Sequence, residues 1–245
     1  MNLKLFACGD VLNFKAKEDF IDRNLTEIIR NSDISICNFE APIYHENMES
    51  INKVGPHVYQ SFESIKHLKY AGFDYVSLAN NHIYDYKQKS LETTLNEFNK
   101  NQINYLGGGV NFEDAHSTKI LNQNVIKIGL LAGCKNEFGC LFEDQKRGWY
   151  AWIFHHKIED NIRELKETCD FVVMITHSGV ENIKFPIKEW RDRYKRLCDV
   201  SAGLHAQVLQ GYEKQNKSLI FYSLGNFYFD TAGYENKSND SYSIV

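Results

Sequence analysis

Five short polar clusters follow apolar runs in the sequence, and their side chains are of the types that bind metal ions. Four of the clusters come where a predicted strand ends and the fifth lies near the carboxyl terminus, and ligands of open α/β sheets bind at the carboxyl ends of strands. We therefore expect the clusters to converge on one point. They are Gly9-Asp10, Asn38-Phe39-Glu40, Ala79-Asn80-Asn81-His82, Thr176-His177-Ser178-Gly179 and Gly203-Leu204-His205-Ala206-Gln207.

The chemistry of these side chains indicates a divalent transition metal. Carboxylate, amide oxygen and neutral imidazole together suit Mn, Fe or Zn better than Ca, which prefers oxygen ligands throughout. Two such ions roughly 3.5–4 Å apart would form a clamp for phosphoryl transfer. The sequence thus predicts a metal site, and phosphoryl chemistry if two ions are present.

Apolar runs alternate with amphipathic stretches, which is typical of an α/β domain with largely buried sheets. Since no linker or internal repeat interrupts residues 1–245, we expect a single domain. The predicted strands are 3–8, 34–39, 74–78, 103–106, 125–132, 171–176, 218–223 and 227–229. The predicted helices are 15–30, 61–71, 88–100, 153–167 and 186–198.

Other segments give weaker indications. Residues 200–209 give no clear element, and the apolar run 242–245 indicates a strand cut short, with the domain truncated at its carboxyl end. The long polar connection 43–60 is expected to be functional, because loops of that length in compact domains often are. His57 lies in it and could reach a substrate. The glycines at 107–109 are interpreted as a plain turn, since the lysine of a phosphate-binding loop is missing.

Several of these segments resemble the motifs of the CapA family, which is associated with capsule and poly-γ-glutamate biosynthesis. The resemblance runs in order over nearly the whole chain, and segment 203–210, GLHAQVLQ, is similar to the family motif GHHPHVLQ. It implies an α/β, metallophosphatase-like four-layer αββα sandwich. The other matching segments are 9–11 (GDV), 38–42 (NFEAP), 79–86 (ANNHIYDY), 177–181 (HSGVE) and 222–227 (YSLGNF).

The resemblance also implies the metal ligands. Asp10 would bind a first metal, and Glu40 would bridge it to a second one. The remaining ligands of the second metal would be Asn81, His177 and His205.

The same resemblance implies catalytic residues. His82 would act as a general acid beside the leaving group, or would stabilise charge on the phosphoryl oxygens. Asp85, three residues further on, would orient His82, as outer carboxylates often orient imidazoles. Glu181 and Asn226 occupy motif positions that receive no role.

The chain departs from the family pattern around the first metal. Metallophosphatases carry a histidine two residues after the first aspartate, where this chain has Leu12, as is common in the CapA pattern. Leu204 and Gln207 replace two histidines of the GHHPH-like motif. The first site then keeps Asp10, Glu40 and the Gln207 amide oxygen, a poor set. We therefore expect one firmly held metal, with the second weak or absent.

Simpler interpretations exist for several of these residues. Asp10 and Glu40 could cap helices, because an acid after a strand often does so. Asn80 could merely hold a turn, so Asn81 is preferred as the ligand. The aromatic segment 149–154 is expected to be core, and the basic stretch 184–196, interleaved with acids, to be a solvated helix face that could attract an anionic polymer.

Composition excludes several classes of protein. Thirty-two acidic and 28 basic residues give a net charge of −4, which argues against a nucleic-acid binder. The six cysteines contain no C-x-x-C pair and are expected to be reduced. Neither a signal peptide nor a membrane segment is recognisable, so the chain as given is expected to be cytoplasmic, or membrane-associated or extracellular if the natural chain is longer.

Two functional hypotheses follow. One is a metal-dependent hydrolase or transferase that acts on a phosphoester or related group, with an anionic polymer or a phosphorylated small molecule as partner. The other is a non-catalytic accessory or polymer-binding subunit that works with capsule-synthesis proteins. Hydrolysis of amide bonds in a γ-linked glutamate polymer is a third possibility.

Overall fold

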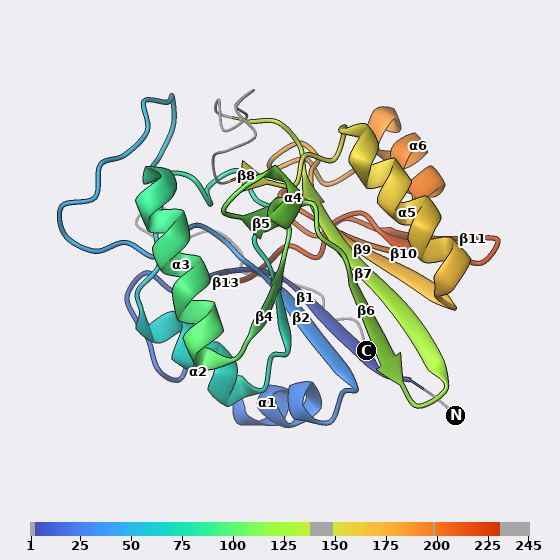
Figure 1. Cartoon of the computed structure of the whole chain (residues 1–245), viewed down its shortest axis with the longest axis horizontal. Coiled ribbons are helices and arrows are strands. Elements are labelled where there is room, and N and C mark those ends of the chain that lie inside the picture. Colours follow the sequence, from blue (N-terminus) through green and yellow to red (C-terminus); the bar gives the residue numbers. More distant parts are fainter. Residues whose placement is uncertain (1–2, 138–148, 198, 231–245) are drawn as a thin grey trace.

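The computed structural model describes residues 3–137, 149–197 and 199–230. Two sheets lie between two outer layers of helices (Figure 1). On the outer side of one sheet lie α1 (Arg23–Arg30), α2 (Glu63–Ala71) and α3 (Lys87–Asn101), and on that of the other lie α5 (His156–Thr168) and α6 (Lys188–Leu197). This is the predicted four-layer αββα sandwich.

The first sheet is parallel throughout, and α1, α2 and α3 form the crossovers between its first four strands in chain order. Its strands, in spatial order, are β13 (Asn226–Phe229), β1 (Leu5–Leu12), β2 (Ile34–Phe39), β3 (Tyr75–Ser77) and β4 (Asn104–Leu106). The prediction of a helix over 15–30 was wrong in its first half. Helix α1 begins only after Asp22, whose side chain accepts a hydrogen bond from the Asn24 amide and caps the helix.

The second sheet is mixed. Its strands, in spatial order, are β11 (Tyr212–Gln215), β12 (Ser218–Phe221), β10 (Val200–Leu204), β9 (Phe171–His177), β7 (Ile126–Cys134) and β6 (Lys119–Gln123). Its inner pairs are parallel, and both edge strands are antiparallel to their neighbours. The sequence did not predict β6 and β11, because edge strands bury little and these two carry mostly polar residues.

The glycines at 107–109 do more than make a turn. Strand β5 (Gly108–Gly109) pairs with β8 (Trp149–Tyr150) in a short antiparallel ribbon beside α4 (Phe112–Ala115). A Cβ atom at Gly109 would lie 2.4 Å from the Ala115 amide nitrogen. The interpretation as a plain turn was therefore wrong, since these glycines allow the ribbon to pack against α4.

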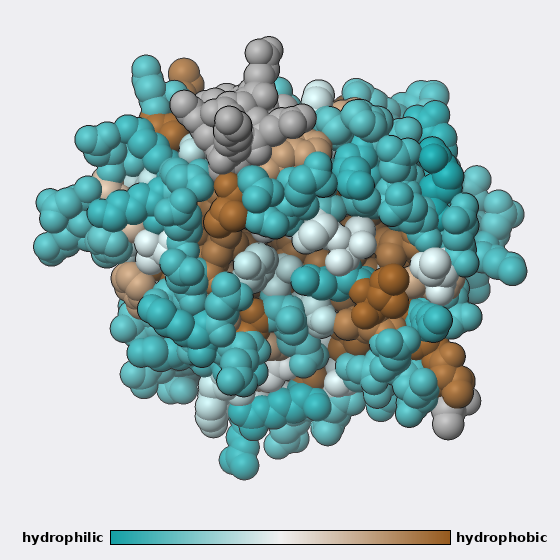
Figure 2. Space-filling view, viewed as in Figure 1, coloured by the Kyte–Doolittle hydropathy of each residue, from teal (hydrophilic) through white to brown (hydrophobic). Residues whose placement is uncertain are grey.

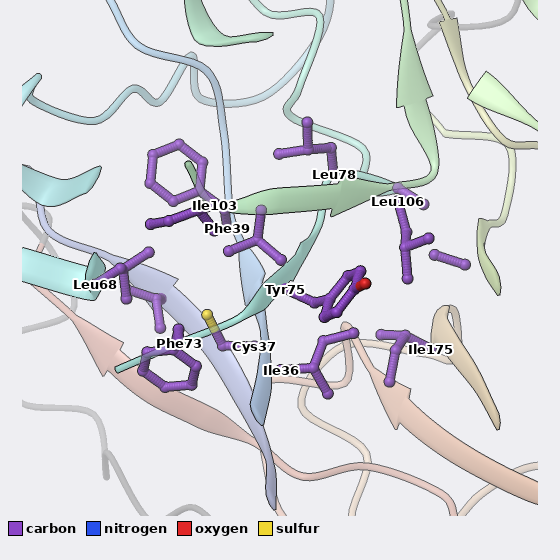
Figure 3. Packing of buried hydrophobic residues seen from close by; sticks show 14 of the residues in the cluster. Ile36, Cys37, Phe39, Leu68, Phe73, Tyr75, Leu78, Ile103, Leu106 and Ile175 are labelled. Atoms are coloured by element: carbon purple, nitrogen blue, oxygen red, sulfur yellow. The ribbon is translucent and has the colours of Figure 1, made fainter. Parts of the chain in front are cut away.

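The main core lies between the two sheets. Ile36 on β2 and Tyr75 on β3 project toward Ile175 on β9, with Leu106 on β4 beside them (Figure 3). A second cluster packs α5 and α6 against the outer face of the second sheet and includes Trp190 and Tyr194. The first core fixes the two sheets relative to each other and so fixes the strand ends that carry polar residues.

The surface shown in Figure 2 is mainly hydrophilic, with apolar residues gathered between the layers. Among the described residues, no helix combines the length and apolar composition that a membrane crossing needs. Four cysteines are free thiols: Cys8, Cys37, Cys134 and Cys169. The other two cysteines and the apolar run 242–245 lie outside the described residues.

Strand register brings the polar clusters to one edge of each sheet. Asp10 pairs with Asn38 on β2 and with Asn226 on β13, so three polar positions lie side by side. In the second sheet, His177 at the end of β9 pairs with Leu204 at the end of β10, directly before His205. These edges meet at the candidate site.

Candidate metal centre

Asp10 is held near the end of β1 by a close approach of two backbones. Its amide donates to the Gly225 carbonyl oxygen, with an N···O distance of 3.1 Å. A Cβ atom at Gly9 would lie 1.8 Å from that oxygen, so position 9 requires glycine. The register of β1 shifts before Asp10 against β2 and after it against β13. Such bulges re-aim side chains next to functional sites.

The side chain of Asn38 connects the two buried acids of the site. Its Nδ2 donates to Asp10 Oδ1 at 2.8 Å and to Glu40 Oε2 at 2.5 Å. Asp10 is 1% exposed and Glu40 is 4% exposed, so both carboxyl groups are removed from water. Asp10 belongs to β1, so the interpretation of it as a helix cap was wrong.

Four ligand-type atoms gather around the imidazole of His177. Its Nε2 lies 2.8 Å from Asn81 Oδ1, 3.1 Å from His205 Nδ1 and 3.6 Å from Glu40 Oε1. Its Nδ1 lies 3.7 Å from Asp10 Oδ1. The ligand atoms of Asp10, Glu40 and His177 all lie within 4.8 Å of one another. The structure thus brings five of the six predicted ligands into one group.

The distances from His177 Nε2 match those between neighbouring donors around a divalent ion. Protein ligands lie about 2.1 Å from such an ion, so neighbouring donors in its shell are roughly 3.0–3.5 Å apart. The three distances from His177 Nε2 cover about that range. The donors are two imidazole nitrogens, one amide oxygen and one carboxylate oxygen, which suits a transition metal better than Ca.

Burial makes the metal-free site electrostatically unfavourable. It raises the pKa of Asp10 to about 7 from an ordinary 3.8, although hydrogen bonds from Asn38 and the His205 backbone lower it. Burial, reinforced by the charge of Asp10, raises the pKa of Glu40 well above its ordinary value. Burial and the nearby His205 lower the pKa of His177. A cation among these groups would favour ionised acids and neutral imidazoles.

Backbone strain and unpaired oxygens accompany the segment after β10. His205 has φ +76° and Gln207 has φ +56°, a left-handed conformation that such residues seldom adopt. Strain of this kind clusters at functional sites. Among the described residues, no hydrogen-bond partner meets the buried Gln207 Oε1 or the buried Asn226 Oδ1. Both oxygens are therefore available as acceptors or ligands at this site.

Gln207 and Leu12 differ from the other predicted positions. None of the contacts described above includes the side chain of Gln207, so its role as a ligand stays a prediction. Leu12 is fully buried in a small apolar cluster with Ala41, Val58 and Phe229. The position that carries a histidine in metallophosphatases therefore serves packing here.

His82 lies in a second, connected group. Its Nδ1 is 2.8 Å from Asp85 Oδ2, which also accepts a hydrogen bond from the Val58 amide at 2.9 Å. Lys53 forms an ion pair with Asp85 Oδ1, and its Nζ is 3.2 Å from His82 Nδ1. The nearby Asn80 holds the turn, as its Oδ1 accepts from the His82 amide at 3.2 Å.

The connection 43–60 contributes Lys53, which sequence reasoning missed. Only the length of this loop indicated a function, and His57 was the residue in it that the sequence favoured for contact with a substrate. The structure instead places His57 Nε2 2.7 Å from the Ile51 carbonyl oxygen, within the loop itself. Lys53 could not be chosen, because nothing local distinguishes it from an exposed lysine.

A second group of acids borders His205. Ligand atoms of Glu137, Glu181 and His205 lie within 4.8 Å of one another, and His205 Nε2 is 3.4 Å from Glu137 Oε1. The charge of Glu137 is already paired with an ammonium, because Lys135 Nζ lies 2.6 Å from Glu137 Oε1. Lys135 Nζ also lies 2.6 Å from the Gly179 carbonyl oxygen. Glu137 is therefore placed to orient His205, leaving His205 Nδ1 toward His177. Sequence reasoning missed Glu137, because it lies outside every recognised segment.

The basic stretch 184–196 is partly neutralised by acids. Lys188 pairs with Asp192, and Lys195 Nζ is 2.7 Å from Glu213 Oε1. His155 caps α5 by accepting from the Lys157 amide. Lys188, Asp192 and Lys195 belong to α6 and His155 directly precedes α5, in the helical layer over the second sheet (Figure 1), whereas Glu213 lies on β11.

Comparison with known proteins identifies relatives over most of the chain. A family model described as "Bacterial capsule synthesis protein PGA_cap" matches residues 4–231. The capsule biosynthesis protein CapA of Bacillus anthracis is 31% identical over 223 residues, covering 86% of this chain and 54% of that protein. The PGA biosynthesis protein CapA of Bacillus subtilis is 32% identical over 228 residues, covering 86% and 57%. The chain thus spans little more than half the length of these relatives.

Solved structures share the fold at low sequence identity. A 5'-nucleotidase precursor from Thermus thermophilus superposes with a TM-score of 0.58 and 10% identity, covering 92% of this chain and 49% of that one. The calcineurin-like phosphoesterase YfkN from Bacillus subtilis gives 0.52 and 12%, covering 99% and 78%. At such identity the likeness supports a metallophosphatase-like fold and no more.

Proposed function

The chain belongs to the family of bacterial capsule synthesis proteins described as PGA_cap, and we propose that it is a metal-dependent hydrolase or transferase. Its substrate would carry a phosphoester or related group and take part in capsule or cell-surface polymer metabolism. The observation that carries the proposal is the convergence of Glu40, Asn81 and His205 on His177 Nε2 at 2.8–3.6 Å.

The ligands divide into a complete set and an incomplete one. The complete set for one ion is Glu40, Asn81, His177 and His205. Asp10 faces the other side of the His177 ring and would hold a second ion only with Glu40 and Gln207. Because Leu12 offers no ligand, the first position is weak, and we propose one firmly bound ion, Mn, Fe or Zn. Such an ion supplies positive charge that polarises a phosphoryl oxygen and acidifies water.

The residues of the chain then divide the remaining work. His82 would donate a proton or a hydrogen bond to the leaving oxygen through Nε2, because Asp85 engages Nδ1. Asp85 would fix the orientation of that ring. Asn38 would keep Asp10 and Glu40 in place by its two hydrogen bonds.

A non-catalytic role is the second candidate. Because Leu12 is buried and Gln207 replaces a histidine, the first metal position has few ligands. A protein with one structural ion could bind an anionic polymer or other capsule-synthesis proteins without turnover.

Metal content and turnover distinguish the two candidates. Elemental analysis of the purified protein should find about one ion per chain, and Mn²⁺ should support hydrolysis of an aryl phosphate mono- or diester. His82→Ala should abolish turnover while the protein keeps its metal. His156 is exposed, and His156→Ala should leave both turnover and metal content unchanged. Bound metal without turnover of any ester supports the accessory role, and cleavage of γ-linked polyglutamate would indicate an amide hydrolase instead.

A further inference from the structure

We propose that Lys53 is a positioning residue of this site, which holds the Asp85–His82 pair in its working arrangement. The proposal rests on the proposed function, because it assigns Lys53 to the histidine expected to act on the leaving group. It extends that function by making the connection 43–60 part of the machinery.

The three side chains form a compact chain of contacts. Lys53 pairs with Asp85 Oδ1, and Asp85 Oδ2 lies 2.8 Å from His82 Nδ1. Lys53 Nζ also lies 3.2 Å from His82 Nδ1, so the ammonium borders the pair; it donates to Asp85 and not to Nδ1 when Nδ1 carries a proton. The side chains of Lys53 and Asp85 are fully buried, and that of His82 is 8% exposed.

Because Asp85 is buried, the Lys53 ammonium compensates the charge of its carboxylate. A carboxylate without water is strongly disfavoured unless a cation or several donors compensate it. Asp85 receives one backbone donor, the Val58 amide, on Oδ2. Lys53 supplies the compensating charge on Oδ1, so that Asp85 remains an ionised acceptor for His82 Nδ1–H. With one proton on Nδ1, the ring turns Nε2 toward the substrate, and a second proton that Nε2 takes up from solvent is the one that His82 donates to the leaving oxygen.

The loop around Lys53 is tied to Asp85 by its backbone as well. The Ile51 amide donates to the Asp85 carbonyl oxygen at 2.9 Å, and His57 closes the loop on Ile51. These contacts do not involve the lysine side chain, so the loop keeps anchors when that side chain is changed. A variant at position 53 therefore tests the charge of the Lys53 side chain and its contact with Asp85, and not the conformation of the loop.

The same loop offers a matched control. Glu49 forms an ion pair with Lys87 at 2.6 Å, with side chains 83% and 48% exposed. Exposed pairs contribute little. Lys87→Met removes the ammonium that pairs with Glu49 of this loop, and it leaves the contacts of His82 unchanged.

The first experiment reads the tautomer of His82 and needs no turnover. Long-range ¹H–¹⁵N spectra of ¹⁵N-histidine protein loaded with Zn²⁺ should show His82, assigned with His82→Ala, protonated on Nδ1. Lys53→Met should mix the two tautomers and draw the two ¹⁵N shifts together, while Lys53→Arg and Lys87→Met should leave them separate. An unchanged His82 spectrum in Lys53→Met would overturn the proposal.

The second experiment reads chemistry. With Mn²⁺, Lys53→Met should lower kcat for phenyl phosphate about 10- to 100-fold, the usual effect of losing an outer partner of a site. The loss should be smaller for nitrophenyl phosphate, whose leaving group needs less help, KM should change little, and Lys53→Arg should restore part of the rate. Equal losses on both esters would contradict a role through His82. If the wild type cleaves no ester, the proposed function fails, and the spectra still decide the role of Lys53.

Discussion

The buried carboxyl group of Asp10 makes the metal-free protein less stable than it need be. Its folded-state pKa of about 7 lies above the ordinary 3.8, so the folded chain holds this proton more tightly than the unfolded chain. The stabilising contribution of the neutral form is complete below about pH 4 and is lost as the pH rises through about 7. Above that pH, Asp10→Asn should stabilise the metal-free protein.

The magnitude follows from the same two values. At 1.36 kcal/mol per pKa unit, the difference between 3.8 and about 7 corresponds to about 4 kcal/mol, a ceiling because water can enter the empty site. The charge of Asp10 also raises the pKa of Glu40, so the substitution relieves both acids. Asparagine retains an oxygen that can accept the hydrogen bond from Asn38 Nδ2. We expect a gain of at least about 1 kcal/mol.

Urea unfolding in EDTA at several pH values measures this gain. The gap between Asp10→Asn and wild type should be near zero at about pH 4 and reach its full size above about pH 7. The exposed Asp19→Asn should change the free energy of unfolding by less than about 0.5 kcal/mol at every pH. Saturating metal should close the gap, because a cation bound beside Asp10 favours the ionised carboxylate that is unfavourable without it. A less stable Asp10→Asn protein in EDTA at pH 8 would refute the reasoning.

Three further predictions concern the metal and the backbone beside it. Metal affinity should rise with pH up to about 7, because the charge of a bound ion favours loss of the proton from the neighbouring Asp10, and calorimetry in buffers of different ionisation enthalpy should detect its release; an affinity independent of pH would contradict this. Gln207→His should raise the metal content from about one toward two ions per chain by elemental analysis, and an unchanged content would contradict Gln207 as the cause of the weak second site. Gly9→Ala should cost at least about 3 kcal/mol in urea unfolding or prevent folding, since its Cβ would lie 1.8 Å from Gly225 O. The control Gly211→Ala meets nothing within 4 Å and should stay within about 1 kcal/mol of wild type.

The sequence by itself determined the layered fold and the ligand types of the site. Apolar runs fix which segments become buried strands, and a polar residue directly after such a run must lie at a strand end. That local logic placed Glu40, Asn81 and His177 at strand ends, whereas the family resemblance supplied His205. The structure brings Glu40, Asn81 and His205 within 3.6 Å of His177 Nε2. It failed for the edge strands β6 and β11, whose polar residues carry no such pattern.

Only the tertiary structure decided which charges compensate one another. Lys53 lies 32 residues from Asp85 along the chain, and Lys135 and Glu137 precede His205 by more than 60. Before folding, each is an ordinary solvated side chain, and nothing in its neighbours sets it apart. Folding removes water from Asp85, and a buried carboxylate is strongly disfavoured without a nearby cation. The cation that compensates it is the one that the fold places beside it. The strand pattern is a property of local sequence, whereas the pairing of buried charges is a property of the packed molecule.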